Sequence, residues 1–264
     1  DLYEQLPRWG GPDGKAAATV AIWEEQGIGD QILFSTMLPE LIGTGQPFIY
    51  EVDRRLLPAY RRSFPENDFV ALDDPPADVL RQASAVLFAG SLPGFFRRTV
   101  EDFSRQPRKL LKASPQRVEH YTARLGDGFR VALSWRSQRS GWIGRSKSVA
   151  LADMTPLFAV SGVRWVDVQY GDTVNEREML EREGKTRLVH FDEIDYREDL
   201  EDVLALLAAC DLLITTSNAS AHFAGALGRP VWLLYPTAQP PFHYWAHRGD
   251  HRCGHRVARR TTHW

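Results

Sequence analysis

Short apolar runs alternate along the chain with longer stretches whose apolar residues repeat every three to four positions. The run at 19–23 is typical of a buried strand, and the apolar residues from Asp30 to about Ile42 predict one helix. Strands that alternate with helices through short links favour a mostly parallel sheet with helices on both faces, so we expect an α/β fold. The strands of this first series are predicted at 19–23, 48–52, 69–72 and 85–88.

A second alternating series begins with the run RVALSW at 130–135. The stretch 91–128 contains three prolines and no strand-like run, and we interpret it as a connection between domains. The sequence therefore predicts an N-terminal domain with its linker at 1–128 and a C-terminal domain with its tail at 129–264, facing each other across a cleft. Further strands are predicted at 163–170, 188–191, 212–216 and 231–235, and helices from about 153 and at 173–184, 196–210 and 219–227.

Both ends of the chain lack such periodicity. Residues 1–18 form a polar leader, and residues 243–264 are rich in His and Arg. A poorly packed C-terminus is the simpler interpretation, because no second Cys or acidic ligand completes a zinc site there. The residues that would have to form such a site are His243, His247, His251, Cys253, His255 and His263.

Composition narrows the class of protein. Apolar residues make up 43% and charged residues 25% of the chain, as in globular proteins. The net charge of -2 gives no overall field that would attract nucleic acid, and no apolar run approaches the roughly 20 residues of a membrane span. With only Cys210 and Cys253 there is no disulfide framework, so we expect a cytoplasmic protein. The chain begins at Asp1, and we expect upstream sequence in the full-length protein.

The stretch 210–236 carries the clearest candidate site. Two apolar runs flank a predicted helix at 219–227 that Gly228 closes, and Ser217 and Asn218 are residue types that cap helix N-termini. A helix N-terminus beyond the carboxyl end of a parallel strand offers backbone N–H groups to an anion. The alternative is an ordinary βαβ unit whose turn only caps the helix.

A second candidate lies where the first strand leads into its helix. Gly27 and Gly29 suit a loop that approaches a ligand, but a dinucleotide fingerprint needs a third glycine where this chain has Ile32. This disfavours a nicotinamide or flavin dehydrogenase. Asp30 is either the N-cap of the helix or a general base that takes a proton from an acceptor.

A third candidate is the loop at 134–147, which contains Arg136, Arg139, Arg145 and Lys147 and no acidic residue. These cations suit a diphosphate, since arginine offers a planar fork and lysine a point charge. A solvated loop is the alternative.

Three further residues complete the candidate set. In VQYGD at 168–172, Gln169 is placed to bind a nucleobase edge, and Tyr170 either stacks on the base or belongs to the core. His222 lies within the helix at 219–227 and faces a phosphate or simply packs.

Four motifs in order resemble one family over residues 19–245: EEQGIGDQILFSTMLPEL, LSWRS, VQYGD and TTSNASAHFAGALGRPVWLL. They resemble the glycosyltransferase-like domain that follows tetratricopeptide repeats in many bacterial proteins. That domain is similar to the heptosyltransferases of glycosyltransferase family nine and, more distantly, to peptide O-GlcNAc transferases.

The resemblance implies a GT-B fold of two Rossmann-like domains, a nucleotide-sugar donor held mainly by the second domain, and no metal or other cofactor. Heptosyltransferases have Asp-Thr where this chain has Ser217 and Asn218, so the resemblance does not identify the donor. Carried over by motif, Gly29 and Asp30 correspond to the base motif, and the donor-phosphate turn corresponds to Ser217, Asn218, Ala219, Ser220 and His222.

The function that the resemblance implies is sugar transfer from a nucleotide-sugar. In this view Asp30 is the base, while Arg136 and Lys147 join the turn in stabilising the departing phosphate. A protein such as flagellin or a surface glycan is the candidate acceptor, with upstream tetratricopeptide repeats as a partner. The alternative is a non-catalytic GT-B-like domain that senses nucleotide-sugars or serves as a scaffold.

Overall fold

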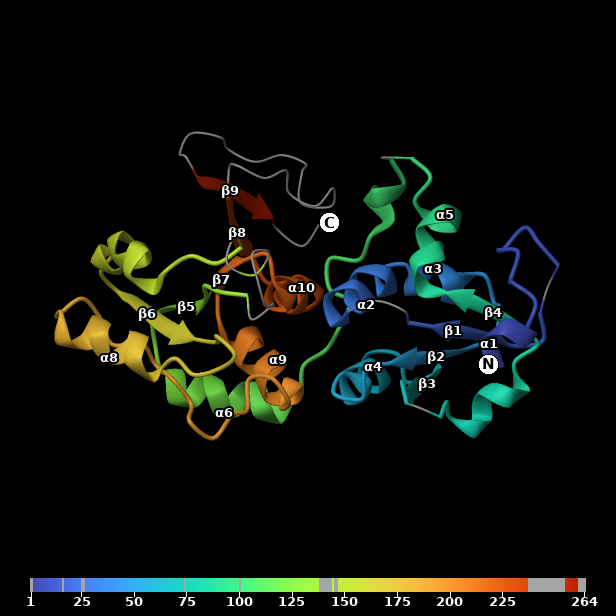
Figure 1. Cartoon of the computed structure of the whole chain (residues 1–264), viewed down its shortest axis with the longest axis horizontal. Helices are drawn as coiled ribbons and strands as arrows, with labels where there is room; N and C mark the ends of the chain where they lie inside the picture. Colours follow the sequence, from blue (N-terminus) through green and yellow to red (C-terminus); the bar gives the residue numbers. More distant parts are fainter. Residues whose placement is uncertain are drawn as a thin grey trace. The chain divides into compact units, whose positions relative to one another are not determined.

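The computed structural model describes residues 2–15, 17–24, 27–73, 75–99, 101–137, 144, 147–236 and 255–260. The chain divides into two compact units, unit 1 up to Lys112 and unit 2 from Ala113. Each unit has an α/β fold with its own sheet (Figure 1). The sequence predicts a linker that ends at residue 128, but the division falls earlier. Helix α6 (Pro115–Leu125), which lies in the predicted linker, belongs to unit 2.

Unit 1 contains a four-stranded parallel sheet in the order β3-β2-β1-β4. The four strands predicted for this half of the chain are confirmed to within one residue at each end. The elements are α1 (Leu2–Gln5), β1 (Val20–Trp23), α2 (Ile28–Ser35), α3 (Leu38–Gly43), β2 (Phe48–Val52), α4 (Leu57–Ser63), β3 (Asp68–Ala71), η1 (Asp78–Gln82), β4 (Ala85–Phe88), η2 (Ala89–Ser91), α5 (Leu92–Phe96) and η3 (Glu101–Arg105).

The single helix predicted over 30–42 is two helices, α2 and α3. The Thr36 hydroxyl donates to the Leu33 carbonyl at 2.6 Å and closes α2, and Pro39 lies in the first turn of α3. Proline has no N–H and its ring clashes with the preceding turn, so a continuous helix cannot pass this point. Apolar periodicity continues across such a break and does not reveal it.

The N-terminal leader is ordered against unit 1, contrary to its lack of pattern. Arg8 forms a parallel bridge with Val86 at the β4 edge. Farther back, the Tyr3 ring stacks on Trp23 with centroids 4.7 Å apart, and its hydroxyl donates to the buried carboxyl of Glu51. Since these contacts join residues far apart in sequence, local periodicity could not predict them.

Unit 2 contains a five-stranded sheet in the order β6-β5-β7-β8-β9, parallel except for β9. The run predicted as a strand at 188–191 contributes only an isolated bridge between Val189 and Val166. The elements after α6 are β5 (Phe129–Ser134), η4 (Leu151–Ala159), β6 (Val163–Asp167), α8 (Val174–Arg182), α9 (Leu200–Ala209), β7 (Leu212–Thr216), α10 (Ala219–Ala226), β8 (Val231–Pro236) and β9 (His255–Arg260).

The tail was expected to pack poorly, and for 255–260 this is wrong: the segment is strand β9, antiparallel to β8. The backbone N–H and C=O groups at the edge of β8 form hydrogen bonds with β9. Backbone pairing of this kind does not depend on a periodic pattern of apolar residues in the tail. The other tail residues of the zinc hypothesis lie outside the described residues.

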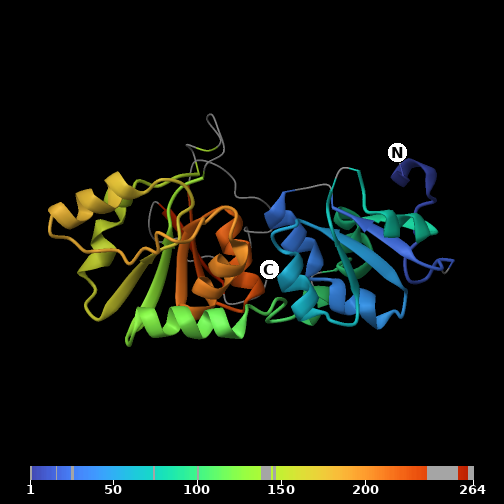
Figure 2. The same ribbon diagram turned by 90° about the horizontal axis from the view of Figure 1, so that it is seen from below.

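The helices of unit 2 follow the predicted apolar faces. Helix α9 buries most of its length, and α6 lies beside it, as both views show (Figures 1 and 2, α6 green, α9 orange). The Tyr121 hydroxyl of α6 donates to the Asp202 carboxylate of α9 at 2.8 Å. At the end of α10, Gly228 has φ 73°, a conformation that glycine adopts without strain, and so closes this helix as predicted.

Candidate functional site

The carboxyl ends of β5, β6 and β7 are joined by one polar network in unit 2. Its centre is Gln169, just beyond β6, whose side-chain oxygen accepts from the backbone N–H groups of Trp135 and Arg136, each at 2.9 Å. Its amide nitrogen donates to the Tyr170 carbonyl at 2.9 Å. Gln169 is completely buried. This side chain therefore holds the ends of two strands together and does not present its amide at the surface for a nucleobase.

Asn218 links this network to α10. It is the N-cap of the helix, as predicted, and its side-chain oxygen accepts from the Ser220 N–H at 3.0 Å. Its amide nitrogen donates to the Ser134 hydroxyl at 2.9 Å. The turn is not sealed, because Ser217, Asn218 and Ala219 are each partly exposed. The Ser220 N–H donates to the cap and is not available to an anion. An anion at this turn would have to bind backbone N–H groups that come before Ser220 in the sequence.

Asp167, a fully buried carboxylate at the end of β6, holds the Gln169 side of this network in place. It accepts from the Gln169 N–H at 2.8 Å and from the Thr173 hydroxyl at 2.7 Å. Two cationic or potentially cationic groups face it as well, with His190 Nδ1 at 2.9 Å and Arg177 Nε at 3.4 Å. Four partners on one carboxylate fix the path of the turn that carries Gln169.

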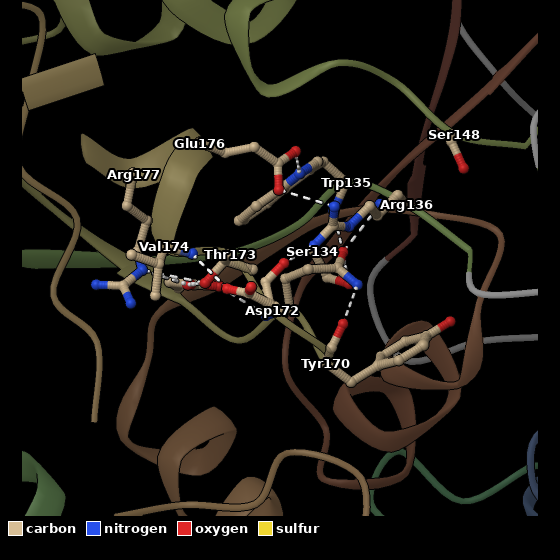
Figure 3. Close-up of polar contacts among 12 residues, drawn as sticks. Ser134, Trp135, Arg136, Ser148, Tyr170, Asp172, Thr173, Val174, Glu176 and Arg177 are labelled. Atoms are coloured by element: carbon tan, nitrogen blue, oxygen red, sulfur yellow. Dashed lines mark hydrogen bonds and ion pairs between the residues drawn. The ribbon is translucent and has the colours of Figure 1, made fainter. Parts of the chain in front are cut away.

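Arg136 lies against α8 and the turn before it (Figure 3). Its guanidinium is 2.8 Å from the Glu176 carboxylate and also donates to the Asp172 carbonyl. The same carboxylate accepts from the Trp135 indole N–H at 2.8 Å. This ion pair holds the Arg136 side chain on α8, so its charge is shared with Glu176 before any ligand arrives.

Lys147 and Tyr170 are the remaining candidate residues of this region that the structure describes. Lys147 is partly exposed in a turn, and Arg139 and Arg145 lie outside the described residues. Tyr170 is also partly exposed, and Figure 3 shows its ring directed away from its own backbone carbonyl. The stacking role of Tyr170 stays a prediction.

His222 is buried within α10 and is 5% exposed. Burial lowers the pKa of its imidazole to about 3, since a charged ring would lose its hydration. The side chain is therefore neutral near pH 7. It supplies no positive charge to a phosphate, and packing is the role that its environment supports.

In unit 1, Gly29 and Asp30 lie in the first turn of α2. The N-cap is Gly27, not Asp30, because the helix begins two residues earlier than its apolar pattern indicates. Gln31 fixes this helix end, since its side-chain oxygen accepts from the Asp53 N–H at 2.9 Å. Asp30 is partly exposed, as a general base must be. A carboxylate in a first turn is also favoured by the helix dipole.

Several residues that shape the site were missed by the sequence reasoning. Asp167, Thr173 and Glu176 carry the anchoring contacts, and Trp135 supplies a donor. A signal existed for Asp167, because an acidic residue inside a buried strand requires partners. Within the described ranges, no group of three or more His, Cys, Asp or Glu side chains is arranged to hold a metal.

No protein-family model matches this chain. Over 249 residues it is 32% identical to protein FlbA of Caulobacter vibrioides, a match that covers 87% of this chain and 41% of FlbA. The chain thus spans about two fifths of the length of that curated relative. Of the helices that the structure describes, none is both long enough and apolar enough to cross a bilayer.

Solved structures with the same fold include glycosyltransferases. A glycosyltransferase family 9 protein from Veillonella parvula has a TM-score of 0.62 at 12% identity, and the match covers 84% of this chain and 82% of that one. ADP-heptose LPS heptosyltransferase II of Escherichia coli has a TM-score of 0.57 at 14% identity, covering 85% of this chain and 86% of that one. Two α/β units with parallel sheets give this chain the fold of GT-B glycosyltransferases.

Proposed function

We propose that this chain is a glycosyltransferase domain that binds a nucleotide-sugar at the carboxyl edge of the unit 2 sheet. The observation that carries the proposal is the network in which Gln169, Ser134 and Asn218 join three strand ends to the capped N-terminus of α10. In parallel α/β sheets, ligands bind at this edge, and a helix N-terminus there favours a diphosphate. Structural similarity to glycosyltransferases supports the same reaction class.

In the proposed reaction, the Asp30 carboxylate takes the proton of an acceptor hydroxyl. The acceptor oxygen forms a bond to the anomeric carbon as the bond from that carbon to the phosphate oxygen breaks. The nucleoside diphosphate leaves with the electron pair, and the α10 N-terminus and Lys147 stabilise its charge. Arg136 stabilises the same charge only if its ion pair with Glu176 opens. The cleft that the resemblance implies stays a prediction.

Calorimetry with UDP-, GDP-, ADP- and CMP-sugars tests the donor site. We expect one nucleotide class to bind, and Asn218→Ala to weaken binding at least tenfold, because it removes both the cap and the bond to Ser134. Asn218→Thr retains a capping oxygen and should lose less affinity. Equal affinities for the wild type and both Asn218 variants would contradict the donor site.

The role of Asp30 is tested separately. Asp30→Asn should abolish transfer while the donor still binds.

A second candidate is a non-catalytic domain that binds nucleotide-sugars. It is favoured by the pairing of Arg136 with Glu176 and by the neutrality of His222, which reduce the positive charge available to a leaving diphosphate. Donor binding without transfer to any acceptor, and without donor hydrolysis, would favour this candidate.

The acceptor, the tetratricopeptide repeats, the cytoplasmic location and the independence from metal stay predictions. FlbA extends well beyond the part that this chain matches, which leaves room for further segments in that relative. Transfer measured with and without EDTA decides the metal dependence. Flagellin and surface glycans are the acceptors to compare first.

A further inference from the structure

Arg97, directly after α5 in unit 1, has an unusual distribution of partners. Its side chain is 2% exposed. One terminal nitrogen, Nη1, donates to the Glu40 carboxylate of α3 and to the Phe96 carbonyl, the latter at 2.9 Å. Over the part of the chain that is described, the other two nitrogens, Nε and Nη2, have no hydrogen-bond partner although both are buried. Figure 1 shows α5 and α3 next to each other in unit 1.

These two N–H groups are the side of the guanidinium that binds oxyanions. Nε and Nη2 point the same way, and their spacing matches two oxygens of one carboxylate or phosphate. Buried donors are normally satisfied, so two unpartnered nitrogens on a buried arginine favour an acceptor at this position.

Two other side chains, one of them the ion-pair partner of Arg97, also have a buried atom without a described hydrogen-bond partner. Glu40 Oε2 is buried without a partner among the described residues, and so can accept a hydrogen from a hydroxyl. In the same segment as Arg97, the buried Gln106 has a side-chain N–H that is also unpartnered there. Arg105 donates to the same Phe96 carbonyl as Arg97, at 3.3 Å, so two guanidinium groups converge on one oxygen.

The segment that begins with Arg97 also has an excess of positive charge along the sequence. Between 97 and 112 the sequence has six basic residues against two acidic ones. The acidic residues do not neutralise this excess, and Asp102 is already paired with Arg105 at 2.8 Å. The basic residues are Arg97, Arg98, Arg105, Arg108, Lys109 and Lys112.

The cover over Arg97 is weakly held. The η3 segment buries none of its side chains. Its Phe103 lies over the guanidinium, with the guanidinium carbon 5.8 Å from the ring centroid, and is 42% exposed. Segments with few buried contacts open at low free-energy cost, which gives a small ligand a way in.

We propose that Arg97 and Glu40 form a binding site for a phosphate or carboxylate group that carries an adjacent hydroxyl. The oxyanion takes the Nε and Nη2 hydrogens of Arg97, and the hydroxyl donates to Glu40 Oε2. The site is independent of nucleotide binding in unit 2. We assign the bound oxyanion to an anionic group of the acceptor, and this assignment rests on the proposed transferase function.

Calorimetry on the whole chain at constant ionic strength, without nucleotide, tests the site. The probes are inorganic phosphate, glycolate as a hydroxy-carboxylate, and ethylene glycol as a neutral control. We expect saturable binding of phosphate or glycolate, and the stronger of the two identifies the source of the oxyanion. Ethylene glycol should not bind. If neither anion saturates, ordered water fills the fork and the proposal is wrong.

Two variants and a matched control make the test specific to Arg97. Arg97→Lys keeps the charge but loses the fork, and should weaken binding at least tenfold. Arg98→Lys, the same change at an exposed neighbour, should leave it unchanged. Glu40→Gln removes the carboxylate that accepts from the ligand hydroxyl and should change the affinity for glycolate about threefold or more, which keeps the test decisive if Arg97→Lys does not fold. Unchanged glycolate binding in Glu40→Gln, or equal binding in Arg97→Lys, would overturn the proposal.

This test is separate from that of the donor site. Loss of oxyanion binding leaves nucleotide binding in unit 2 unaffected, and loss of nucleotide binding in Asn218→Ala leaves the Arg97 site unaffected.

Discussion

Buried polar side chains at particular sites of the two units are partnered to different degrees. In unit 2, the Asp167 carboxylate has four partners, and Gln169 and Asn218 use both ends of their amides. In unit 1, the buried Glu51 carboxyl has a donor, Tyr3, on one oxygen and no described partner on the other, and Arg97 is likewise half-occupied. The Asp167 site is therefore more completely partnered than the Glu51 and Arg97 sites, although unit 2 also contains a buried oxygen without a described hydrogen-bond partner, Thr216 Oγ1.

The number of hydrogen-bond partners decides whether a buried polar site is rigid or responds to a proton or a ligand. A fully satisfied buried network fixes one geometry, because any movement breaks several hydrogen bonds at once. A half-satisfied buried group is costly as it stands, and a proton or a ligand relieves that cost. We therefore expect the Asp167 network to respond to mutation mainly through loss of stability, and the Glu51 and Arg97 sites through changes in pH or ligand dependence.

The largest effect should come from removing the charge at the centre of the Asp167 network. Asp167→Asn keeps the size of the side chain but leaves Arg177 and His190 facing a neutral amide. Breaking a buried ion pair from one side costs about 3–5 kcal/mol, so we expect the free energy of unfolding to fall by about 3 kcal/mol. Urea unfolding followed by circular dichroism measures it.

The matched control is Asp172→Asn, five residues farther along. Asp172 is exposed and accepts from the Val174 N–H at 2.9 Å, a bond that the asparagine oxygen can retain. Its effect should stay within about 0.5 kcal/mol. Similar losses in the two variants would show that burial of Asp167 is not what makes its charge important.

Much of the fold was predictable because parallel strands that are buried on both faces read as continuous apolar runs. β2 and β7 are buried along their whole lengths and were predicted within one residue. The Asn218 cap was also predictable, since it depends on one residue next to one apolar stretch. These features are all local in sequence.

What the sequence could not predict depends on pairs of distant residues. Arg136 was expected to bind a phosphate, but its partner Glu176 lies 40 positions away and holds it on α8. Gln169 was expected at a nucleobase, but it bonds to backbone groups more than 30 positions earlier. A residue type suggests what a side chain can bind, and only the fold decides whether another part of the chain binds it first.

His222 should give unit 2 a sensitivity to acid. Its folded pKa of about 3 lies below the ordinary value of 6.5, so the unfolded chain takes up a proton first as the pH falls. The stability is complete above pH 6.5 and is lost progressively toward pH 3. Between pH 7 and pH 5 the loss should be about 2 kcal/mol. His222→Gln should remove most of this dependence in urea unfolding at the two pH values, and an unaltered dependence would mean that the ring is not buried as described.

Glu51 should give unit 1 the opposite dependence, with a smaller amplitude. Burial raises its pKa to about 7, against the opposing effect of the Tyr3 hydrogen bond, while the Asp73 charge raises it further. Because the folded pKa lies above the ordinary value of 4.5, the contribution of Glu51 to stability is complete below pH 4.5 and is lost as the pH rises through 7. The full shift corresponds to about 3 kcal/mol between pH 4.5 and pH 8, and we expect an observed loss of about 1–2 kcal/mol because protein and solvent screen the charge.

Two variants decide whether the half-satisfied carboxyl causes this loss. Glu51→Gln cannot ionise, so it should gain about 1–2 kcal/mol on the wild type between pH 4.5 and pH 8. Tyr3→Phe removes the one donor that stabilises the carboxylate, and should enlarge the loss by about 1 kcal/mol. Urea unfolding at the two pH values gives both numbers. If Tyr3→Phe leaves the loss unchanged, the leader does not control ionisation of Glu51, and the contrast between the units reduces to burial alone.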